Sequence, residues 1–360
     1  MKILHFGCAY LPYMGGSTIR IKNLVYHYRK GCEKLDLITH VPSGGEQTDA
    51  PFDRVWRISA ANSVMPLKEV LSIVRRGQYD VVVLHNSRVL FAWLVWYRWI
   101  SMRTRVVVEI HSVRDAGSLI KRYLNRLLYR RVDRVVHLGE GARAYFERQY
   151  GLVPGAVIRN GSKVSDSQRI QRKKEYASSS CTFTYVGSFY DWQGVVVLAR
   201  ALALVNDDFW QRNKVIFVGD GPALNQVKSI LKEIRNDRLV IMGWQPKAVI
   251  DKVLTDADFL LAPRISTPAT ETVVPLKVSE SIETGIPLIA TRVGGLLECL
   301  PETAAFYIEP GSVAQLADRL MNPPSESEYR KVCAELASLK FPTWEESGRQ
   351  YIDLFSSVRA

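Results

Sequence analysis

The chain has 360 residues, of which 47% are hydrophobic and 23% are charged, and its formal net charge is +12. This composition excludes a disordered chain, and the length predicts two domains rather than one. The longest apolar stretch, Val89–Tyr97, is too short to span a bilayer, and the opening residues lack the apolar run of a signal peptide. Five cysteines occur without any C-x-x-C spacing, which predicts reduced thiols, no zinc site and a cytoplasmic chain.

The excess of positive over negative charge is confined to the amino-terminal half. Residues 1–165 carry 26 Lys and Arg against 12 Asp and Glu, whereas residues 166–360 carry 22 against 24. Tryptophans and a tyrosine accompany this charge, and such a mixture favours contact with an anionic membrane surface. The alternatives are tryptophans in the core of a helix with solvated arginines, or nucleic-acid binding, for which no known motif is present. The residues concerned are Trp93, Trp96, Tyr97, Trp99, Arg98, Arg103, Arg105, Arg114, Lys121, Arg122, Arg126, Arg130, Arg131 and Arg134.

Strands alternate with helices in the first half of the sequence, which predicts a doubly wound parallel sheet. Strands are expected near residues 2–6, 34–39, 54–58, 80–84, 105–110, 133–138 and 155–159. Helices are expected over the apolar face Ile21–Tyr28, ending at Gly31, and near residues 66–76, 88–102, 117–131 and 141–150. After the first strand, Gly15 and Gly16 allow backbone N–H groups to approach an anion at a helix start.

A polar segment, residues 163–180, is predicted to be an interdomain linker. A second alternating set follows, with strands near 181–187, 214–218, 238–242, 258–262, 287–290 and 304–308. The sequence therefore predicts two Rossmann-like domains in tandem. The glycine turns at Gly187-Ser188 and Gly219–Pro222 fit neither the dinucleotide fingerprint nor a Walker A loop, which counts against a dehydrogenase and an NTPase.

The segment 258–300 has the most informative pattern in the chain. A buried strand leads through a loop to a helix with Pro275 at its first position, and Gly285 ends that helix. Ligands of parallel sheets collect where strand ends meet helix starts, because free N–H groups and the helix dipole favour phosphate there. Glu280 can accept hydrogen bonds from a ribose diol, and Lys277 would lie near a diphosphate. The alternative is an ordinary surface helix.

Several short motifs and single residues follow one another in a characteristic order along the whole chain. They are Gly15-Gly16, His111, Asn160-Gly161, Gly187, Gly219-Asp220-Gly221-Pro222, Gly243, Ala262-Pro263, Glu271, Glu280, Gly285-Ile286-Pro287, Gly294-Gly295, Glu298 and Trp344-Glu345-Glu346. Together they resemble the retaining GT-B glycosyltransferases of family 4. The resemblance implies an α/β fold with two Rossmann-like domains facing across a cleft. It implies an acceptor domain at 1–165, a donor domain at 166–340, and a last helix at 341–360 that crosses back to the first domain.

The resemblance also implies roles for individual residues. Glu280 corresponds to the family's second glutamate, which contacts the donor ribose, and Lys277 to a lysine that precedes it in one subgroup. Glu271 would face the transferred sugar, although it lies nine residues before Glu280 rather than the usual eight. His111 would lie beside the same sugar.

The sequence lacks one feature of the family and contains one segment that resembles a motif of a different fold. The usual arginine and lysine after the first strand of the second domain are replaced by Ser188 and Gln193. Because a departing diphosphate still needs stabilisation, Lys277, Arg264, the amides near Gly15 and Gly16, and a helix dipole are the candidates. Asp256-Ala257-Asp258 resembles a metal-binding D-x-D of another fold but leads into a buried strand, so no metal is inferred.

The resemblance thus implies a retaining, metal-independent glycosyltransferase that uses a UDP- or GDP-linked sugar and needs no cofactor. It also implies that the acceptor attacks the sugar from the face that the diphosphate leaves. The basic first half favours a lipid-linked or surface-polysaccharide acceptor and a peripheral location on the inner face of the cell membrane. The alternatives are a GT-B sugar-nucleotide epimerase, a catalytically silent nucleotide-sugar-binding relative, and a nucleic-acid-binding module whose affinity would fall steeply with salt.

Overall fold

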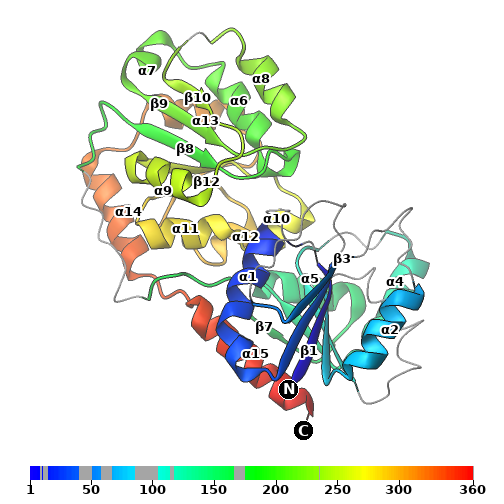
Figure 1. Ribbon diagram of the computed structural model, residues 1–360. Helices are drawn as coiled ribbons and strands as arrows, with labels where there is room; N and C mark the ends of the chain where they lie inside the picture. The colour runs from blue at the N-terminus through cyan, green and yellow to red at the C-terminus, as the bar shows by residue number, and fades with distance from the viewer. Residues whose placement is uncertain are drawn as a thin grey trace. The chain divides into compact units, whose positions relative to one another are not determined.

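The computed structural model describes the chain except residues 9, 11–14, 40–50, 58–66, 86–103, 114–116, 166–174, 235 and 360. The chain divides into two compact units (Figure 1). Unit 1 comprises Met1–Gly161 and Pro342–Ala360, and unit 2 comprises Ser162–Phe341. None of the helices in the described ranges is long and apolar enough to cross a membrane.

Unit 1 is built on a parallel sheet whose strands are ordered β3-β2-β1-β4-β5-β6-β7. Helices cover both faces of this sheet, so its central strands are apolar on both sides; residues 81–84 are fully buried. The strands are β1 (Lys2–Cys8), β2 (Lys34–Thr39), β3 (Arg54–Arg57), β4 (Val81–His85), β5 (Arg105–Ile110), β6 (Arg134–His137) and β7 (Gly155–Val157).

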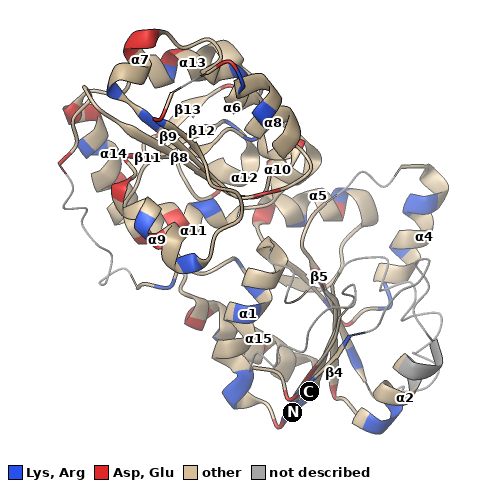
Figure 2. Ribbon diagram, turned by 45° about the horizontal axis from the view of Figure 1, so that its top comes forward, with Lys and Arg blue, Asp and Glu red and all other residues tan. Residues whose placement is uncertain are grey.

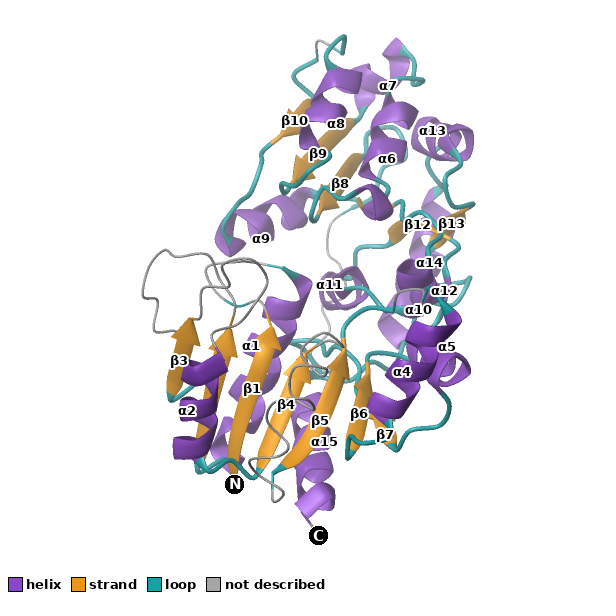
Figure 3. Ribbon diagram, turned by 90° about the vertical axis from the view of Figure 1, so that its right-hand side faces the viewer, coloured by secondary structure: helices purple, strands orange, loops and turns teal. Residues whose placement is uncertain are grey.

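The helices of unit 1 flank its sheet, with α1 and α15 on one face and α2 and α4 on the other (Figures 1 and 3). The last helix, α15, packs along α1, where the Tyr28 and Phe355 rings meet edge to face at 5.8 Å. A 3-10 turn, Arg29–Gly31, extends α1 to the predicted glycine. The helices are α1 (Gly16–Tyr28), α2 (Leu67–Gly77), α4 (Leu119–Tyr129), α5 (Glu140–Tyr150) and α15 (Trp344–Arg359).

Unit 2 contains a second parallel sheet, with the strand order β10-β9-β8-β11-β12-β13. Its strands are β8 (Thr182–Val186), β9 (Lys214–Val218), β10 (Leu239–Ile241), β11 (Phe259–Ala262), β12 (Leu288–Thr291) and β13 (Phe306–Ile308). Its helices are α6 (Val195–Leu202), α7 (Asp207–Arg212), α8 (Leu224–Leu231), α9 (Lys247–Asp256), α10 (Pro268–Thr272), α11 (Leu276–Thr284), α12 (Gly294–Leu297), α13 (Val313–Met321) and α14 (Glu326–Ser338), and a 3-10 turn spans Asp191–Gln193.

The predicted alternation of strands and helices is confirmed in both units. The strands at 34–39, 105–110 and 214–218 match their predicted bounds residue for residue. The predicted helix at 88–102, with its three tryptophans, lies outside the described residues.

Two local predictions are wrong. The predicted linker 163–180 contains Tyr176, which is buried in unit 2, stacks on Tyr329 at 3.9 Å, and donates a hydrogen bond to the Pro324 carbonyl at 2.6 Å. One aromatic residue in a polar stretch is enough to anchor the chain there. The segment after β11, predicted as a loop, contains α10, and Pro275 is the N-cap of α11 rather than its first residue.

Candidate functional site

The predicted donor-binding residues of unit 2 lie at the carboxyl ends of two neighbouring strands. Strands β8 and β11 are adjacent and parallel, so their ends meet at one edge of the sheet. Gly187 and Ser188 follow β8, Arg264 follows β11, and Lys277 lies in the first turn of α11. A Cβ atom added at Gly187 would lie 3.4 Å from Lys277 Nζ, so the lysine reaches the end of β8.

Lys277 is a buried cation, with 7% of its surface exposed. Its Nζ donates a hydrogen bond to the Val186 carbonyl and lies 4.3 Å from the centre of the Tyr185 ring. The Tyr185 hydroxyl in turn donates to the Ser188 carbonyl at 2.8 Å. Burial lowers the pKa of Lys277 to about 8; the charge of Glu280 opposes this shift, and that of Arg264 adds to it.

Arg264 is a second buried cation at the same edge, with 3% of its surface exposed. One guanidinium nitrogen donates to the Val273 carbonyl at 3.2 Å, and the group lies 5.4 Å from the Trp192 ring centre. Its Nε has no hydrogen-bond partner among the described residues. Burial lowers the pKa of Arg264 to about 10, although the nearby Tyr185 and Glu271 oppose the shift.

Neither cation forms an ion pair with a carboxylate in the described part of the chain. An unpaired buried charge costs several kcal/mol unless something compensates it. Two such cations lie at the strand ends of unit 2, and no carboxylate among the described residues pairs with either.

Glu280 lies on α11, one turn after Lys277, and is half-buried. Its carboxylate makes no hydrogen bond or close ion pair within the described ranges. Burial raises the pKa of Glu280, while the charge of Lys277 opposes this rise. The carboxylate is therefore free to accept hydrogen bonds from hydroxyl groups of a ligand.

Glu271, by contrast, is already engaged within unit 2. One carboxylate oxygen accepts a hydrogen bond from the Ser266 hydroxyl at 2.6 Å, and the other accepts one from the Gly294 N–H at 2.7 Å. A Cβ atom at Gly294 would lie 2.4 Å from the Glu271 carbonyl, so only glycine fits here. Glu271 thus ties α10 to the start of α12, and its predicted contact with a sugar would use the remaining lone pairs.

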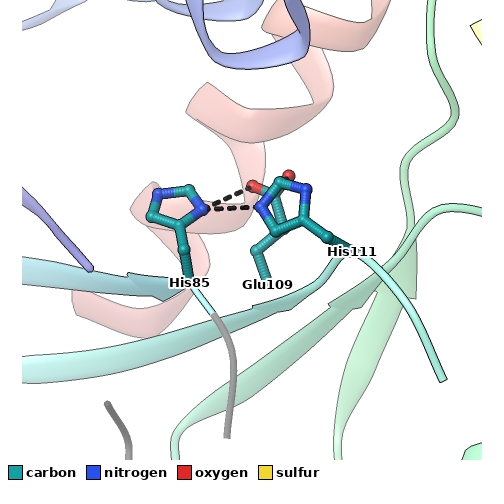
Figure 4. A group of neighbouring side chains, drawn as sticks. All are labelled: His85, Glu109 and His111. Atoms are coloured by element: carbon teal, nitrogen blue, oxygen red, sulfur yellow. Dashed lines mark hydrogen bonds and ion pairs between the residues drawn. The ribbon is translucent and has the colours of Figure 1, made fainter. Parts of the chain in front are cut away.

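His111 belongs to unit 1, where it follows the end of β5 with 18% of its side chain exposed. Its Nε2 lies 2.8 Å from His85 Nδ1 and 3.5 Å from Glu109 Oε1 (Figure 4). His85 Nε2 lies 2.8 Å from His5 Nδ1, and His5 Nε2 lies 2.5 Å from the Tyr28 hydroxyl. His111 is therefore the outer end of a series of hydrogen-bonded side chains that runs into the core of unit 1.

A buried ion pair between Arg20 and Glu109 lies next to this series of side chains. Arg20 Nε donates to Glu109 Oε1 at 2.6 Å, and Tyr351 of α15 donates its hydroxyl proton to Oε2. Arg20 also donates to Asn160 Oδ1 at 3.1 Å and to the Ile158 carbonyl at 2.8 Å. Burial alone would raise the pKa of Glu109, but Arg20, with the nearby imidazoles and the Tyr351 hydroxyl, holds that pKa well below its usual range.

Sequence reasoning missed these supporting residues. His5, His85 and Glu109 are polar side chains inside otherwise apolar strands, and that position was the available signal. Their contact depends on the strand order β1-β4-β5, in which His85 pairs with Glu109.

Among the described residues, His85, Glu109 and His111 offer ligand atoms close enough to share a metal ion, within 4.8 Å of one another. The carboxylate of Glu109 is nevertheless occupied by Arg20 and Tyr351. A divalent cation there would replace those bonds and lie beside a buried guanidinium. We therefore interpret the group as a hydrogen-bonded network.

The remaining predicted residues are Gly15 and Gly16 in unit 1. Gly15 is the N-cap of α1 in extended conformation, and Gly16 is the first helical residue. No side chain caps the start of α1, and its first turn contains no acidic side chain.

Two family models match the chain, one in each unit. Residues 15–161 match a glycosyl transferase 4-like domain, and residues 180–322 match the glycosyl transferases group 1.

Known relatives resemble the chain at low identity. The phosphatidylinositol N-acetylglucosaminyltransferase GPI3 subunit of Saccharomyces cerevisiae is 23% identical over an alignment of 291 positions, which covers 78% of this chain and 63% of that protein. The chain thus spans slightly less than two thirds of the yeast relative. The 2-deoxystreptamine glucosyltransferase of Streptomyces kanamyceticus is 27% identical over an alignment of 289 positions, which covers 72% of each chain.

Solved structures share the fold over nearly the whole length. HepE of Anabaena, in complex with UDP and glucose, superimposes with a TM-score of 0.76 at 16% identity and covers 99% of this chain and 100% of that one. At such identity the likeness concerns the fold alone. It confirms the predicted α/β fold of GT-B type with two Rossmann-like domains.

Proposed function

We propose that this chain, which belongs to the group 1 glycosyltransferases of family 4, transfers a sugar from a nucleoside diphosphate sugar to an acceptor hydroxyl. The observation that carries the proposal is the pair of buried cations at the strand ends of unit 2, Arg264 and Lys277, which lack ion-pair partners among the described residues. A diphosphate supplies the negative charge that these two groups are missing.

The chemistry of transfer explains why the cations are buried. As the bond from the sugar to the diphosphate breaks, negative charge develops on the leaving oxygen, and fixed cations in a site of low polarity stabilise that charge strongly. Lys277 and Arg264 take over the role of the family's arginine and lysine, whose positions hold Ser188 and Gln193 here. Bound phosphate would also raise the pKa of Lys277 from about 8 and keep it protonated.

The carboxylates take different parts in this proposal. Glu280 accepts hydrogen bonds from the ribose hydroxyls, because its carboxylate has no partner in the described ranges. Glu271 positions the Gly294 amide and contacts the sugar through its remaining lone pairs. Because the Glu271 carboxylate is engaged by Ser266 and the Gly294 amide, we do not assign it as a covalent nucleophile and favour retention of configuration by attack of the acceptor from the leaving-group face, without a metal ion. In unit 1, His111 contacts the transferred sugar.

The acceptor is proposed to be lipid-linked, because unit 1 has a surface suited to an anionic membrane. Helix α4 exposes Leu119, Ile120, Tyr123 and Leu124, each with more than half of its surface accessible. Lys121, Arg122 and Arg126 lie on the same helix, and Figure 2 shows this positive charge along α4. Apolar and basic side chains together on an exposed helix are typical of attachment to the bilayer interface. This arrangement supports a peripheral location on the inner face of the cell membrane.

The donor is proposed to be UDP- or GDP-linked, and a panel of donors tests the activity. The wild-type chain would be incubated with UDP-glucose, UDP-N-acetylglucosamine, GDP-mannose and ADP-glucose, together with a lipid extract, and products followed by NMR. We expect release of nucleoside diphosphate with one donor, and an α-anomeric product. Altered sugar released without acceptor would instead indicate an epimerase, and no binding of any donor at millimolar concentration would indicate a silent relative.

A further inference from the structure

His111 and the two histidines behind it, His85 and His5, form a continuous series of ring-to-ring contacts. Each link joins a nitrogen of one ring to a nitrogen of the next at 2.8 Å, from His111 through His85 to His5, and the inner end meets the Tyr28 hydroxyl at 2.5 Å. Each residue comes from a different element: β5's end, β4, β1 and α1. The outer residue is partly exposed and the others are buried, so the series connects the surface of unit 1 with its core.

Hydrogen counting allows two orderings of this series. A neutral imidazole carries one N–H and one acceptor nitrogen, so each link needs one donor facing one acceptor. If all donors point inward, each histidine carries its proton on Nε2, and His111 Nδ1 is an acceptor. If all donors point outward, each carries its proton on Nδ1, and His111 presents an N–H instead. Any mixed ordering sets two donors or two acceptors against each other, which costs a buried hydrogen bond.

Glu109 favours the inward ordering. Its Oε1 lies 3.5 Å from His111 Nε2, whereas its Oε2 lies 4.0 Å from His85 Nδ1. A carboxylate stabilises a proton on the nearer nitrogen, and that nitrogen is His111 Nε2. Arg20 and Tyr351 hold the carboxylate in place and keep it ionised.

The burial of the rings keeps the series neutral. Burial lowers the pKa of His5 to about 4 and that of His85 well below its usual value. Burial also lowers the pKa of His111, with Glu109 opposing and Arg20 adding to the shift. Near neutral pH each ring therefore carries a single proton, and the choice between the two nitrogens is the remaining freedom.

We propose that His85 and His5 act as positioning residues that hold His111 in the tautomer protonated on Nε2, so that its Nδ1 is a fixed hydrogen-bond acceptor for a hydroxyl group of the ligand. Figure 4 shows Nδ1 on the side of the His111 ring that faces away from His85, and it has no partner among the described residues. An acceptor of fixed direction discriminates a hydroxyl from a group without a proton to donate. That the hydroxyl belongs to a sugar rests on the proposed function, whereas the tautomer does not.

NMR of the full chain labelled with ¹⁵N-histidine tests the proposal without any substrate. Long-range ¹H–¹⁵N correlations identify the protonated nitrogen of each ring, and substitution of single histidines assigns the signals. We expect His5, His85 and His111 all to be protonated on Nε2 in the wild type. Protonation of His111 on Nδ1, or three rings in mixed tautomers, would overturn the proposal, as would stoichiometric Zn²⁺ binding that shifts all three signals.

Two variants separate positioning by His85 from the effect of Glu109 alone. In His85→Asn, the Asn carbonyl oxygen can replace Nδ1 as acceptor, and we expect His111 to keep its tautomer. In His85→Leu, the acceptor is gone, and the Nε2–H preference of His111 should fall roughly fivefold, the equivalent of one hydrogen bond. An unchanged tautomer in His85→Leu would show that His85 positions nothing. If that variant does not fold, the wild-type tautomers and His85→Asn still decide the ordering.

The outcome is independent of transfer activity. A chain that binds no nucleotide sugar would contradict the proposed function but leave the tautomers as expected. A chain that transfers sugar with His111 protonated on Nδ1 would contradict this inference alone.

Discussion

The two units bury charge in opposite ways. In unit 1, Arg20 is matched by Glu109, Asn160 and a main-chain carbonyl, and the carboxylate of Glu109 has partners for both oxygens. In unit 2, Arg264 and Lys277 each have one carbonyl partner and an aromatic ring, with no ion pair in the described ranges. We interpret the fully paired charges of unit 1 as groups that stabilise the fold, and the unpaired cations of unit 2 as groups that bind a ligand.

This difference predicts that removing a charge has opposite effects on the stability of the two units. The loss of a partner in unit 1 leaves the other charge buried and uncompensated. The loss of a cation in unit 2 removes an unfavourable burial. Removing a charge from unit 1 should therefore lower the free energy of unfolding. Removing a cation from unit 2 should weaken nucleotide binding without lowering the free energy of unfolding.

The largest effect is expected for Glu109→Ala. The substitution leaves Arg20 buried without its carboxylate, and we expect the free energy of unfolding to fall by about 3–5 kcal/mol. Urea unfolding of the full chain measures this loss. Glu280→Ala is the matched control: the relief of burying this carboxylate and the loss of its attraction to Lys277 oppose each other, so stability should change by less than about 1 kcal/mol. Equal losses in the two variants would remove the distinction between the units.

Lys277→Met should stabilise the ligand-free chain. The pKa of Lys277 falls from 10.5 to about 8, and each pKa unit is worth about 1.4 kcal/mol. Against this gain stands one lost hydrogen bond of about 1 kcal/mol, so a net increase of about 2–3 kcal/mol is expected in urea unfolding at pH 7. A destabilised variant would mean that Lys277 supports the fold as Arg20 does.

The pH dependence of the free energy of unfolding tests whether the pKa of Lys277 is lowered in the folded chain. Between pH 8 and 10.5 the unfolded chain keeps the Lys277 proton while the folded chain releases it, so stability attributable to this group rises with pH. The advantage of Lys277→Met over the wild type should therefore shrink by about 1.5 kcal/mol between pH 8 and 9.5. The neighbours Glu280, Arg264 and Tyr185 are present in both proteins and cancel in the comparison. A constant difference would contradict a lowered pKa.

The smallest effect on stability is expected on α4, where the change should be in binding. Leu119→Asp with Leu124→Asp removes two exposed apolar side chains, so unfolding should change by no more than about 0.5 kcal/mol for each. Cosedimentation with vesicles that contain phosphatidylglycerol should nevertheless be lost. Leu204→Asp, an exposed leucine of unit 2, is the control and should leave vesicle binding unchanged. Unaltered cosedimentation of the double variant would exclude α4 as the membrane surface.

Much of the fold follows from local sequence patterns. Apolar runs bounded by glycine and proline predicted the strands of both sheets, because strands buried on both faces need continuous apolar residues. Helix α10 was not predicted, since it has five residues and depends on the capping box between Thr267 and Thr270. Tyr176 was assigned to a linker because its burial depends on Tyr329, which is far away in sequence.

The candidate site could be predicted only where its residues are close in sequence. Lys277 and Glu280 lie on one helix, and their spacing was visible. The histidine series and the Arg20–Glu109 pair depend on strand order and register, and neither follows from local pattern. The same reason hid the bond from Gly294 to Glu271, which joins residues 23 positions apart.

The central claim is that the unpaired cations of unit 2 bind the diphosphate of the donor. Calorimetric titration of UDP and GDP into the wild type, Lys277→Met and Lys228→Met tests it most directly, with the last variant removing a lysine of α8 away from the strand ends. We expect one nucleotide to bind the wild type and Lys228→Met equally, and Lys277→Met at least tenfold more weakly, which corresponds to about 1.4 kcal/mol. Equal affinity in all three proteins would contradict the account.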